Sequence, residues 1–416
     1  MERPTTTLAA DEIDLSDPEL WARPDRQGIF ATLRAERPIA FFAEPEYEVA
    51  TVPQGPGYWS LTRYADVWTV SRNPELFISG RGINIADMPV ELNEFFGSMI
   101  AMDAPKHTRL RMLVQRGFTP KVVAELEDYV RTKATEIVDR VSPLGECDFV
   151  AEIAAPLPLE VICDMMGIPS PDRQRIFELT NQILGVGDPE YASTIEELMA
   201  AAMELYQYAH ALGEERLRDP KDDITSALMQ AEVDGERLSA QEFGSFFILL
   251  VAAGNETTRN AISHGMKALT DFPEQKQKWI DDFEALSGNA VEEIVRWASP
   301  VIHFRRTATA DTVVGGQEIK EGDKLVLWYI SANRDEDHFD DPYSFDVTRH
   351  PNDHVGYGAG GPHFCLGANL ARREIKVMFE ELFRRLPDIH VTGEPDMLQS
   401  NFIHGIKRMP CAFTPA

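Results

Sequence analysis

The sequence predicts a mainly α-helical fold with a minority of small β-sheets. The strongest helix signal starts near Ser239, where Glu242 follows three residues later as in a capping box, and its apolar pattern continues to about Leu269. Runs with strand character are short and are bounded by turns that contain glycine. Strands and helices do not alternate regularly along the chain, so the pattern does not predict a doubly wound parallel sheet.

Residues 1–20 are expected to form a flexible amino-terminal segment, and residues 21–416 a single domain, because no repeat, low-complexity tract or Ser/Gly linker divides them. Strands are expected at residues 58–61 and 324–330, with turns at 315–316 and 321–323. Further helices are expected over about 122–140, through the 170s, 190s and 200s, over 289–297, and over 368–385. Proline should end the 239–269 helix by residue 272 and the 289–297 helix before residue 300.

Composition argues against two classes of partner. The 40 basic and 68 acidic side chains give a formal net charge of −28, which repels nucleic-acid phosphates and anionic membrane surfaces. The amino terminus has no apolar signal core, and the most apolar run, residues 246–253, is shorter than the roughly 20 residues of a membrane-spanning helix. The four cysteines include no C-x-x-C pair, which suits a reducing cytoplasm. We expect a cytoplasmic monomer that neither binds nucleic acid nor spans a membrane.

A glycine-rich segment, residues 354–367 (HVGYGAGGPHFCLG), surrounds Cys365. A thiolate that binds haem iron needs backbone N–H groups directed at its sulfur, and glycines let the chain approach a flat macrocycle closely. A helix that starts just after the cysteine adds the positive end of its dipole, and His363 could reach a haem propionate. Two alternatives stay open: Cys365 is a structural thiol in a turn, or it binds zinc together with His350, His354 and His363.

A polar interruption, residues 253–258 (AGNETT), lies within the long apolar helix. Ala253 and Thr257 share one face of the helix because they lie four residues apart. A small residue beside a hydroxyl could open a pocket for O₂, and Glu256 with Thr257 would supply the acid and the alcohol that protonate a distal oxygen. The alternative is that these polar residues face solvent or cap a local distortion of the helix.

A third pattern is a possible charge cluster. Glu293 and Arg296 lie one helical turn apart and can pair, although such pairs are abundant on solvent-exposed helices. Arg349, at the end of residues 341–349 (DPYSFDVTR), could join them. A buried cluster of this kind is costly unless every charge is paired.

In their order and spacing, these motifs resemble the cytochrome P450 superfamily, specifically its soluble actinobacterial branch, over nearly the whole chain from Tyr58 onward. The resemblance implies the cytochrome P450 fold, with haem b (iron protoporphyrin IX) between the long helix and the Cys365 loop. It also implies roles for individual residues. Cys365 would be the proximal iron ligand, Glu256 and Thr257 the acid–alcohol pair, and Ala253 and Gly254 the oxygen groove.

Further roles come from the same resemblance. Glu293, Arg296 and Arg349 match the structural charge cluster of the family. The residues that match its haem-binding positions, besides Cys365, are His107 and Arg111 in residues 103–111 (DAPKHTRLR), Arg306, His363 and Gly367. The loop departs from the common pattern at one point, because Gly358 stands seven positions before the cysteine, where an aromatic residue is usual, and Tyr357 stands eight before. This looks like the one-residue insertion of lipid- and sterol-oxidising members, so the start of the loop is where its conformation is expected to differ.

Several segments are similar to mycobacterial methyl-branched-lipid ω-hydroxylases, among them residues 95–100, 162–169, 246–260 and 402–407. By that resemblance, an apolar substrate channel is expected to involve Phe95, Phe96, Met99, Ile100, Phe402 and Ile403. Packing of the core would explain the same apolar side chains.

The resemblance implies a monooxygenase that uses O₂ to hydroxylate a lipophilic substrate at or near its terminal carbon, namely a methyl-branched fatty acid, an isoprenoid or a sterol side chain. No flavin or dinucleotide motif occurs, so electrons are expected from a ferredoxin and its reductase, with Arg116, Arg372 and Arg373 as docking charges. The alternatives are a peroxide-driven peroxygenase of the same fold and a non-catalytic haem-binding or sensor protein.

Overall fold

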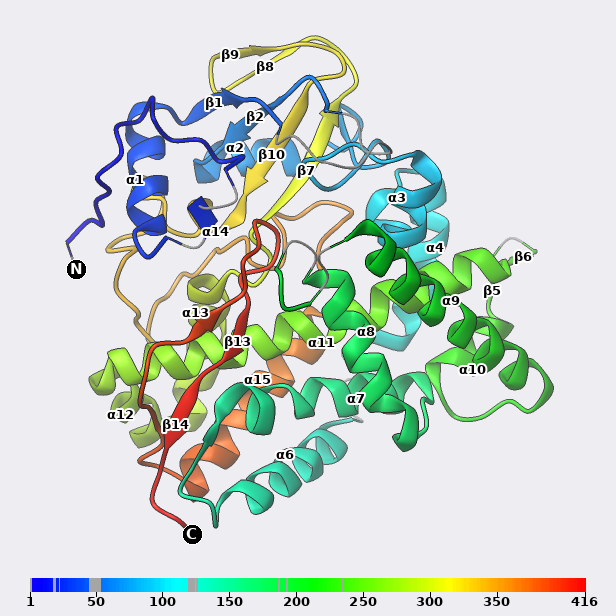
Figure 1. Ribbon diagram of the computed structural model, residues 1–416, viewed down its shortest axis with the longest axis vertical. Helices are drawn as coiled ribbons and strands as arrows, with labels where there is room; N and C mark the ends of the chain where they lie inside the picture. The colour runs from blue at the N-terminus through cyan, green and yellow to red at the C-terminus, as the bar shows by residue number, and fades with distance from the viewer. Residues whose placement is uncertain are drawn as a thin grey trace.

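The computed structural model describes residues 2–17, 20–21, 23–44, 54–118, 124, 126–185, 188–191, 194–233 and 235–416. Helices dominate this part of the chain (Figure 1). The α-helices are α1 (Arg26–Glu36), α2 (Tyr64–Ser71), α3 (Val90–Gly97), α4 (Lys106–Val114), α6 (Glu127–Val141), α7 (Pro156–Met166), α8 (Arg173–Leu184), α9 (Ile195–Arg218), α10 (Ile224–Gln230), α11 (Ala240–Asp271), α12 (Pro273–Asp281), α13 (Phe283–Ala298), α14 (Tyr329–Ala332) and α15 (Ala368–Arg385).

The largest sheet has five strands in the order β1-β2-β10-β7-β3. Only β2 and β10 pair in parallel, so the sheet is mixed. Its strands are β1 (Ile39–Phe42), β2 (Tyr58–Leu61), β3 (Phe77–Ile78), β7 (His303–Ala308) and β10 (Lys324–Trp328). A three-stranded sheet has the order β11-β14-β4, from β4 (Glu146–Asp148), β11 (His390–Val391) and β14 (Pro410–Ala412). Two-stranded pairs join β5 (Glu232–Val233) to β6 (Glu236–Arg237), β8 (Thr312–Val314) to β9 (Gln317–Ile319), and β12 (Asp396–Met397) to β13 (Ile406–Arg408).

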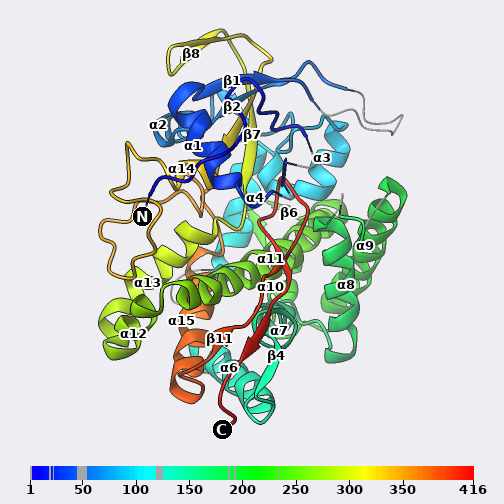
Figure 2. The same ribbon diagram turned by 60° about the vertical axis from the view of Figure 1, so that its left-hand side comes forward.

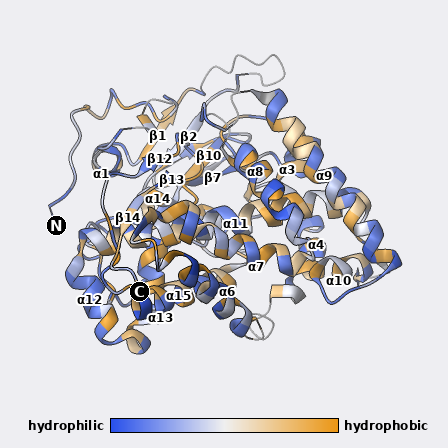
Figure 3. Cartoon of the chain, turned by 60° about the horizontal axis from the view of Figure 1, so that its bottom comes forward, coloured by the Kyte–Doolittle hydropathy of each residue, from blue (hydrophilic) through white to orange (hydrophobic). Residues whose placement is uncertain are grey.

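Helix α11 crosses the middle of the molecule, with the five-stranded sheet towards one end and α6, α7 and α15 on the opposite side (Figures 1 and 2). It packs against α7, α9, α13 and α15, and buries large side chains such as Phe243, Phe247 and Ile262. Most of the surrounding helices mix hydrophobic with hydrophilic residues along their length (Figure 3), as helices with one face in a core do. The central helix is therefore held on several sides, which fixes the residues at its midpoint.

The mainly helical fold with small sheets is confirmed. The capping box at Ser239 and Glu242 is present, and α11 ends at Asp271, just before Pro273. The helix expected at 289–297 is longer, because α13 begins at Phe283. The strand expected at 324–330 ends at Trp328, where the chain turns into α14. The helix expected from about 122 begins at Glu127 in α6, and residues 122, 123 and 125 lie outside the described residues.

Part of the amino-terminal segment that was expected to be flexible contributes to a hydrophobic cluster. Ile13, Leu15 and Leu20 are buried with Trp21, and Trp21 stacks on Trp328 of the five-stranded sheet at 5.2 Å between ring centroids. Across the described ranges, no helix combines the length and the apolar character that crossing a bilayer requires.

Candidate active site

A cavity lies between the middle of α11 and the loop that carries Cys365. The loop side contributes Tyr357, Phe364 and Cys365, and the helix side contributes Ala253 and Thr257. Apolar side chains make up most of the remaining wall, namely Met99, Ile100, Phe118, Ile162, Phe246, Leu249, Leu250, Val301, Phe304, Leu366 and Leu370. Such an apolar cleft with few polar groups is the usual form of a small-molecule site.

Cys365 lies deep in the fold, yet its side chain is accessible because it opens onto this cavity. Burial raises the pKa of its thiol, whereas the backbone N–H groups of Gly367 and Ala368, together with nearby arginines, lower it. The backbone N–H of Cys365 donates to the carbonyl of Tyr357 at 2.9 Å, and α15 starts three residues later at Ala368. The sulfur therefore receives the backbone N–H groups and the helix start that the sequence predicted for a thiolate ligand.

The start of the loop is tied down by Tyr357 and Gly358. Gly358 has a φ of +92°, a conformation that favours glycine, and its N–H donates to the carbonyl of Val355 at 2.9 Å. The buried ring of Tyr357 packs under the guanidinium of Arg372, 4.4 Å from Cζ to the ring centroid. The tyrosine eight residues before the cysteine thus reaches the loop interior, and glycine takes the left-handed turn that follows it.

On the opposite wall, Ala253, Gly254 and Thr257 all line the cavity. Thr257 Oγ1 donates to the carbonyl of Ala253 at 2.8 Å, and the helix remains unbroken at this point. A Cβ on Gly254 would meet Ile162 at 3.1 Å, so the small residue allows α7 to approach α11 closely. Ala253 and Thr257 thus share the face towards the cavity, as their spacing of four residues predicts.

Glu256, expected to act with Thr257, points elsewhere. It is almost wholly buried outside the cavity wall and forms an ion pair with Arg259 one turn further along α11. Burial raises the pKa of its carboxyl, although Arg259 counteracts the shift. Of the expected acid–alcohol pair, only the alcohol therefore lies at the cavity.

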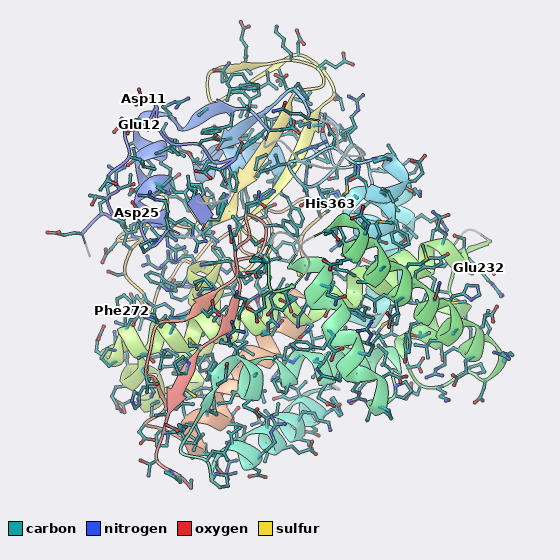
Figure 4. All side chains as sticks on the ribbon, in the orientation of Figure 1. Asp11, Glu12, Asp25, Glu232, Phe272 and His363 are labelled. Atoms are coloured by element: carbon teal, nitrogen blue, oxygen red, sulfur yellow. The ribbon has the colours of Figure 1, made fainter. Side chains whose placement is uncertain are left out.

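A cluster of basic side chains lies at the edge of the cavity: His107, Arg111, Arg306 and His363. The rings of His107 and His363 are 4.4 Å apart, and Arg306 is only 4% exposed. Burial, together with repulsion from Arg306, His107 and Arg111, lowers the pKa of His363 to about 2. His363, labelled in Figure 4, lies between α4 and the five-stranded sheet.

This basic cluster lacks an anion of its own. No carboxylate forms an ion pair with any of its four side chains in the described ranges, and His107 Nε2 and His363 Nδ1 have no hydrogen-bond partner there. Asp103 is near enough to act on His107 and Arg306 through its charge, but it accepts hydrogen bonds from the backbone of Ser79 and Gly80 at 2.8 Å. The two arginines therefore carry positive charge without an ion-paired carboxylate, and the two imidazoles are neutral hydrogen-bonding groups. An unpaired buried charge is costly, so the cluster fits the carboxylates of a haem.

The zinc alternative does not fit the geometry. His354 Nε2 contacts Glu292 at 2.9 Å, whereas His363 Nε2 lies 3.2 Å from Ser79 Oγ. Among the residues with described positions, no group of three or more His, Cys, Asp or Glu side chains could hold a metal ion. The four proposed zinc ligands are therefore not brought together.

The expected charge cluster does assemble. Arg296 makes two hydrogen bonds to the carboxylate of Glu293, both at 2.7 Å, and Arg349 Nε lies 3.1 Å from the same carboxylate. Arg296 also donates to the carbonyls of Asn333 and Pro342 at 2.8 and 3.0 Å. Glu293 and Arg296 are fully buried, and this dense pairing offsets the cost of burying their charges.

The six residues expected in a substrate channel divide into two groups. Met99 and Ile100 line the cavity. Phe95 and Phe96 pack on the main core, with Phe95 5.6 Å from Tyr206. Phe402 lies behind the wall, 5.6 Å from Phe304, and Ile403 forms a β-bridge with Val301.

Several cavity residues were missed by sequence reasoning. Phe246, Leu249 and Leu250 precede Ala253 by seven, four and three residues, so helical spacing alone could have placed them on the same wall. Val301 and Phe304 follow α13 and carry no comparable local signal. Their position depends on how the chain leaves α13 and enters β7.

Comparisons with known proteins agree with this geometry. The Cytochrome P450 family model matches residues 159–400. A methyl-branched lipid omega-hydroxylase of Mycobacterium tuberculosis is 53% identical over 416 residues, covering 99% of this chain and 97% of that protein. A steroid C26-monooxygenase of Rhodococcus jostii is 42% identical over 97% of this chain and 85% of its own. The structure of a Mycobacterium marinum cytochrome P450 in complex with pseudoionone superposes with a TM-score of 0.92, at 46% identity over 99% of this chain and 100% of that one.

Proposed function

The chain belongs to the cytochrome P450 family, and from that premise we propose that this monooxygenase hydroxylates a lipophilic substrate at or near a terminal carbon. The observation that supports this most is the mainly apolar cavity that lies between Cys365 and the Ala253–Thr257 face of α11. A thiol, a small residue and a hydroxyl meet there, with aliphatic and aromatic side chains around them. An apolar substrate can bind in such a site without leaving polar groups of the protein unpaired.

The proposed cofactor is haem b, which the family implies. Cys365 would bind the iron, the N–H groups of Gly367 and Ala368 would stabilise its thiolate, and His107, Arg111, Arg306 and His363 would hold the propionates. When bound, this group supplies O₂ activation and oxidation of a C–H bond.

The chain's own residues would position the reactants and control protons. Ala253 and Gly254 leave space on the distal wall, and Thr257 Oγ1 can accept a hydrogen bond from a water molecule there while it donates to the Ala253 carbonyl. Phe246, Leu249 and Phe304 would exclude bulk water and orient an alkyl chain. When a proton is delivered at the position of Thr257, the electrons lead to product. Without it, they are lost as hydrogen peroxide.

The substrate class follows from the lining and from the relatives. The proteins similar to this chain are named for methyl-branched lipids and for steroid C26, and one similar structure holds pseudoionone. We therefore propose a methyl-branched fatty acid, an isoprenoid or a sterol side chain. Purified protein should show a substrate-induced spin-state shift with at least one of these, and the product should carry its new hydroxyl at or next to a terminal carbon. No shift with any of the three classes would overturn the lipid proposal.

Thr257→Ala tests the chemistry. We expect the variant to consume electrons at a near-normal rate while product per electron falls by about tenfold or more, as for loss of a positioned proton donor. Ser263→Ala is the matched control, because Ser263 Oγ also bonds a carbonyl one turn back on α11, that of Arg259 at 2.8 Å, but does not line the cavity. Full coupling of electrons to product in Thr257→Ala would contradict the proposed role of Thr257. Wild-type turnover with peroxide, but none with O₂ and electrons, would contradict the proposed monooxygenase activity.

The electron donor is proposed to be a ferredoxin with its reductase. Arg372 and Arg373 lie on α15, and Arg373 pairs with Glu127 at 2.6 Å while 29% of its side chain stays exposed. The side chain of Arg116 lies outside the described residues. Arg373→Glu should slow reduction by ferredoxin at low salt, whereas Arg385→Glu should not. Arg385 is a close match on the same helix, 26% exposed and 2.6 Å from Asp139. Equal rates of reduction by ferredoxin in both variants would show that Arg373 is not part of the docking surface.

A further inference from the structure

Two cysteines far apart in the sequence lie side by side, away from the cavity. Cys147 is in β4 and Cys411 is in β14, and the antiparallel register places them directly opposite each other. Their sulfurs are 3.6 Å apart across 264 positions of sequence. Figure 2 shows this small sheet near the end of the molecule where the chain finishes.

The backbone already has the geometry of a cross-link. Directly opposed residues of antiparallel strands have Cα atoms roughly 4.5 or 5.5 Å apart, and disulfides span Cα separations of about 4.4 to 6.8 Å. Because the two sulfurs are in contact, rotation of the side chains alone can close the bond. The strands need not separate or slip in register.

The two thiols differ in access and in acidity. Cys147 is partly exposed, whereas Cys411 is only 1% exposed. The hydrogen bond from Cys411 lowers the pKa of Cys147, against burial and the nearby charges of Glu152 and Asp148, which raise it. The same hydrogen bond and burial raise the pKa of Cys411. The accessible sulfur is thus the better nucleophile, and the buried one is placed to react with it second.

We propose that Cys147 and Cys411 are a reversible oxidative modification site that reacts with hydroperoxides. The Cys147 thiolate attacks one peroxide oxygen, so an S–O bond forms, the O–O bond breaks and, with hydrogen peroxide, hydroxide leaves and is protonated to water. The Cys411 sulfur then attacks the Cys147 sulfur, the S–S bond forms, and the sulfenic oxygen leaves as a second water. Two thiols are oxidised by two electrons and one peroxide is reduced to two waters, and a thiol reductant reverses the change.

The cross-link would fasten the end of the chain to the interior. Just before β14, the Met409 carbonyl accepts from the N–H of Phe149 at 2.8 Å, and the N–H of Ile406 donates to Asn260 Oδ1 at 3.0 Å. Asn260 lies on α11, three residues after Thr257. A disulfide at this sheet would therefore close a loop through most of the chain and stiffen the connection to the helix that carries the cavity face.

The test uses reduced holoenzyme freed of reductant and then treated with a small excess of hydrogen peroxide. Alkylation in denaturant should count four thiols before treatment, and two fewer afterwards. The intact protein should lose the mass of two hydrogen atoms, a peptide linking residues 147 and 411 should appear, and dithiothreitol should restore the starting state.

Three variants test whether the linkage is specific to Cys147 and Cys411. Each variant is first shown to have the absorption spectrum of the folded holoenzyme. Cys163→Ser should form the same linked peptide, because Cys163 lies buried in α7 away from this sheet. Cys147→Ser should keep all its remaining thiols. Cys411→Ser should gain oxygen on Cys147 without forming a disulfide. The proposal is wrong if the wild type keeps four thiols, if Cys147 is oxidised to sulfinic acid while Cys411 stays a thiol, or if Cys411→Ser still loses two thiols.

Discussion

The charge cluster around Glu293 is complete, because it contains its own counterion, whereas the basic cluster at the cavity edge is incomplete among the described residues. Around Glu293, two arginines share one carboxylate, and backbone carbonyls accept their remaining N–H groups. At the cavity edge, the rings of His107 and His363 lie together near Arg111 and Arg306, with no ion-paired carboxylate among the described residues. The first cluster joins one glutamate to two arginines, whereas the second joins two arginines to two histidines, and Arg296 and Arg306 are both buried.

The presence or absence of a counterion distinguishes a cluster that stabilises the fold from one that can bind a ligand. A cluster that contains its own counterion is satisfied by folding alone, so its role ends at stability. A buried arginine without one, such as Arg306, is costly in the folded chain and would be stabilised by an anionic ligand, for which we propose the haem carboxylates. Removal of a charge from the Glu293 cluster should therefore lower the free energy of unfolding, whereas removal of a charge from the basic cluster should weaken the binding of haem.

The largest expected effect is that of Glu293→Gln, which leaves Arg296 and Arg349 buried without a counterion. We expect the free energy of unfolding to fall by about 3 to 5 kcal/mol, as for other broken buried pairs. Denaturant unfolding of the holoenzyme measures it. A loss below about 1 kcal/mol would mean that backbone carbonyls alone satisfy the two arginines.

Glu374 provides the converse case to the basic cluster, because it is a buried acid with no cation paired to it among the described residues. It is 1% exposed beside the cavity, and burial raises the pKa of its carboxyl to about 8, against a hydrogen bond from Thr258 that lowers it. The folded state then binds a proton that the unfolded chain has lost, so this contribution to stability is full below about pH 4.5 and is lost as the pH rises through about 8. Glu374→Gln should remove roughly 2 to 4 kcal/mol of pH dependence between about pH 5 and 8. Parallel stability–pH curves for the two proteins would contradict this.

Removing a charge from the incomplete cluster should affect haem rather than folding. For Arg306→Gln we expect haem dissociation to accelerate by about ten- to a hundredfold, the worth of a hydrogen bond to a charged group. Transfer of haem to a scavenging protein measures the rate. His350→Gln is the control, an exposed histidine outside the cluster. Unchanged haem loss in Arg306→Gln would show that the basic cluster does not hold the cofactor.

The smallest effect is expected at an exposed pair. Lys267 and Asp271 lie 2.7 Å apart on α11, and 47% of the aspartate side chain is exposed. Asp271→Asn should change the free energy of unfolding by less than about 0.5 kcal/mol, because solvent screens such pairs. A loss comparable with that of Glu293→Gln would mean that burial is not what distinguishes the clusters.

Much of the fold and of the cavity face on α11 was predictable from the sequence, because the signals for them are local. Ser239 and Glu242 predicted the start of α11, and spacing on that helix placed Ala253 and Thr257 on one face. The family resemblance gave the residues of both clusters, because motif order carries them. The orientation of Glu256 was not predictable, since it depends on an ion pair that its neighbours in space permit.

Features that depend on tertiary placement stayed hidden. Phe95 and Phe402 were expected at the cavity from their apolar character, but packing assigns them to the core and to a second layer. The contact between Cys147 and Cys411 could not be inferred either, because 264 residues separate them and their pairing exists only in the register of β4 and β14.

The most direct measurement is the absorption spectrum of the reduced, carbon-monoxide-bound protein, compared between wild type, Cys365→Ser and Cys163→Ser. We expect the red-shifted Soret band of thiolate-ligated haem in the wild type and in Cys163→Ser, and its loss in Cys365→Ser. If Cys365→Ser keeps that band, the iron is bound by another residue and the assignment of the site is wrong.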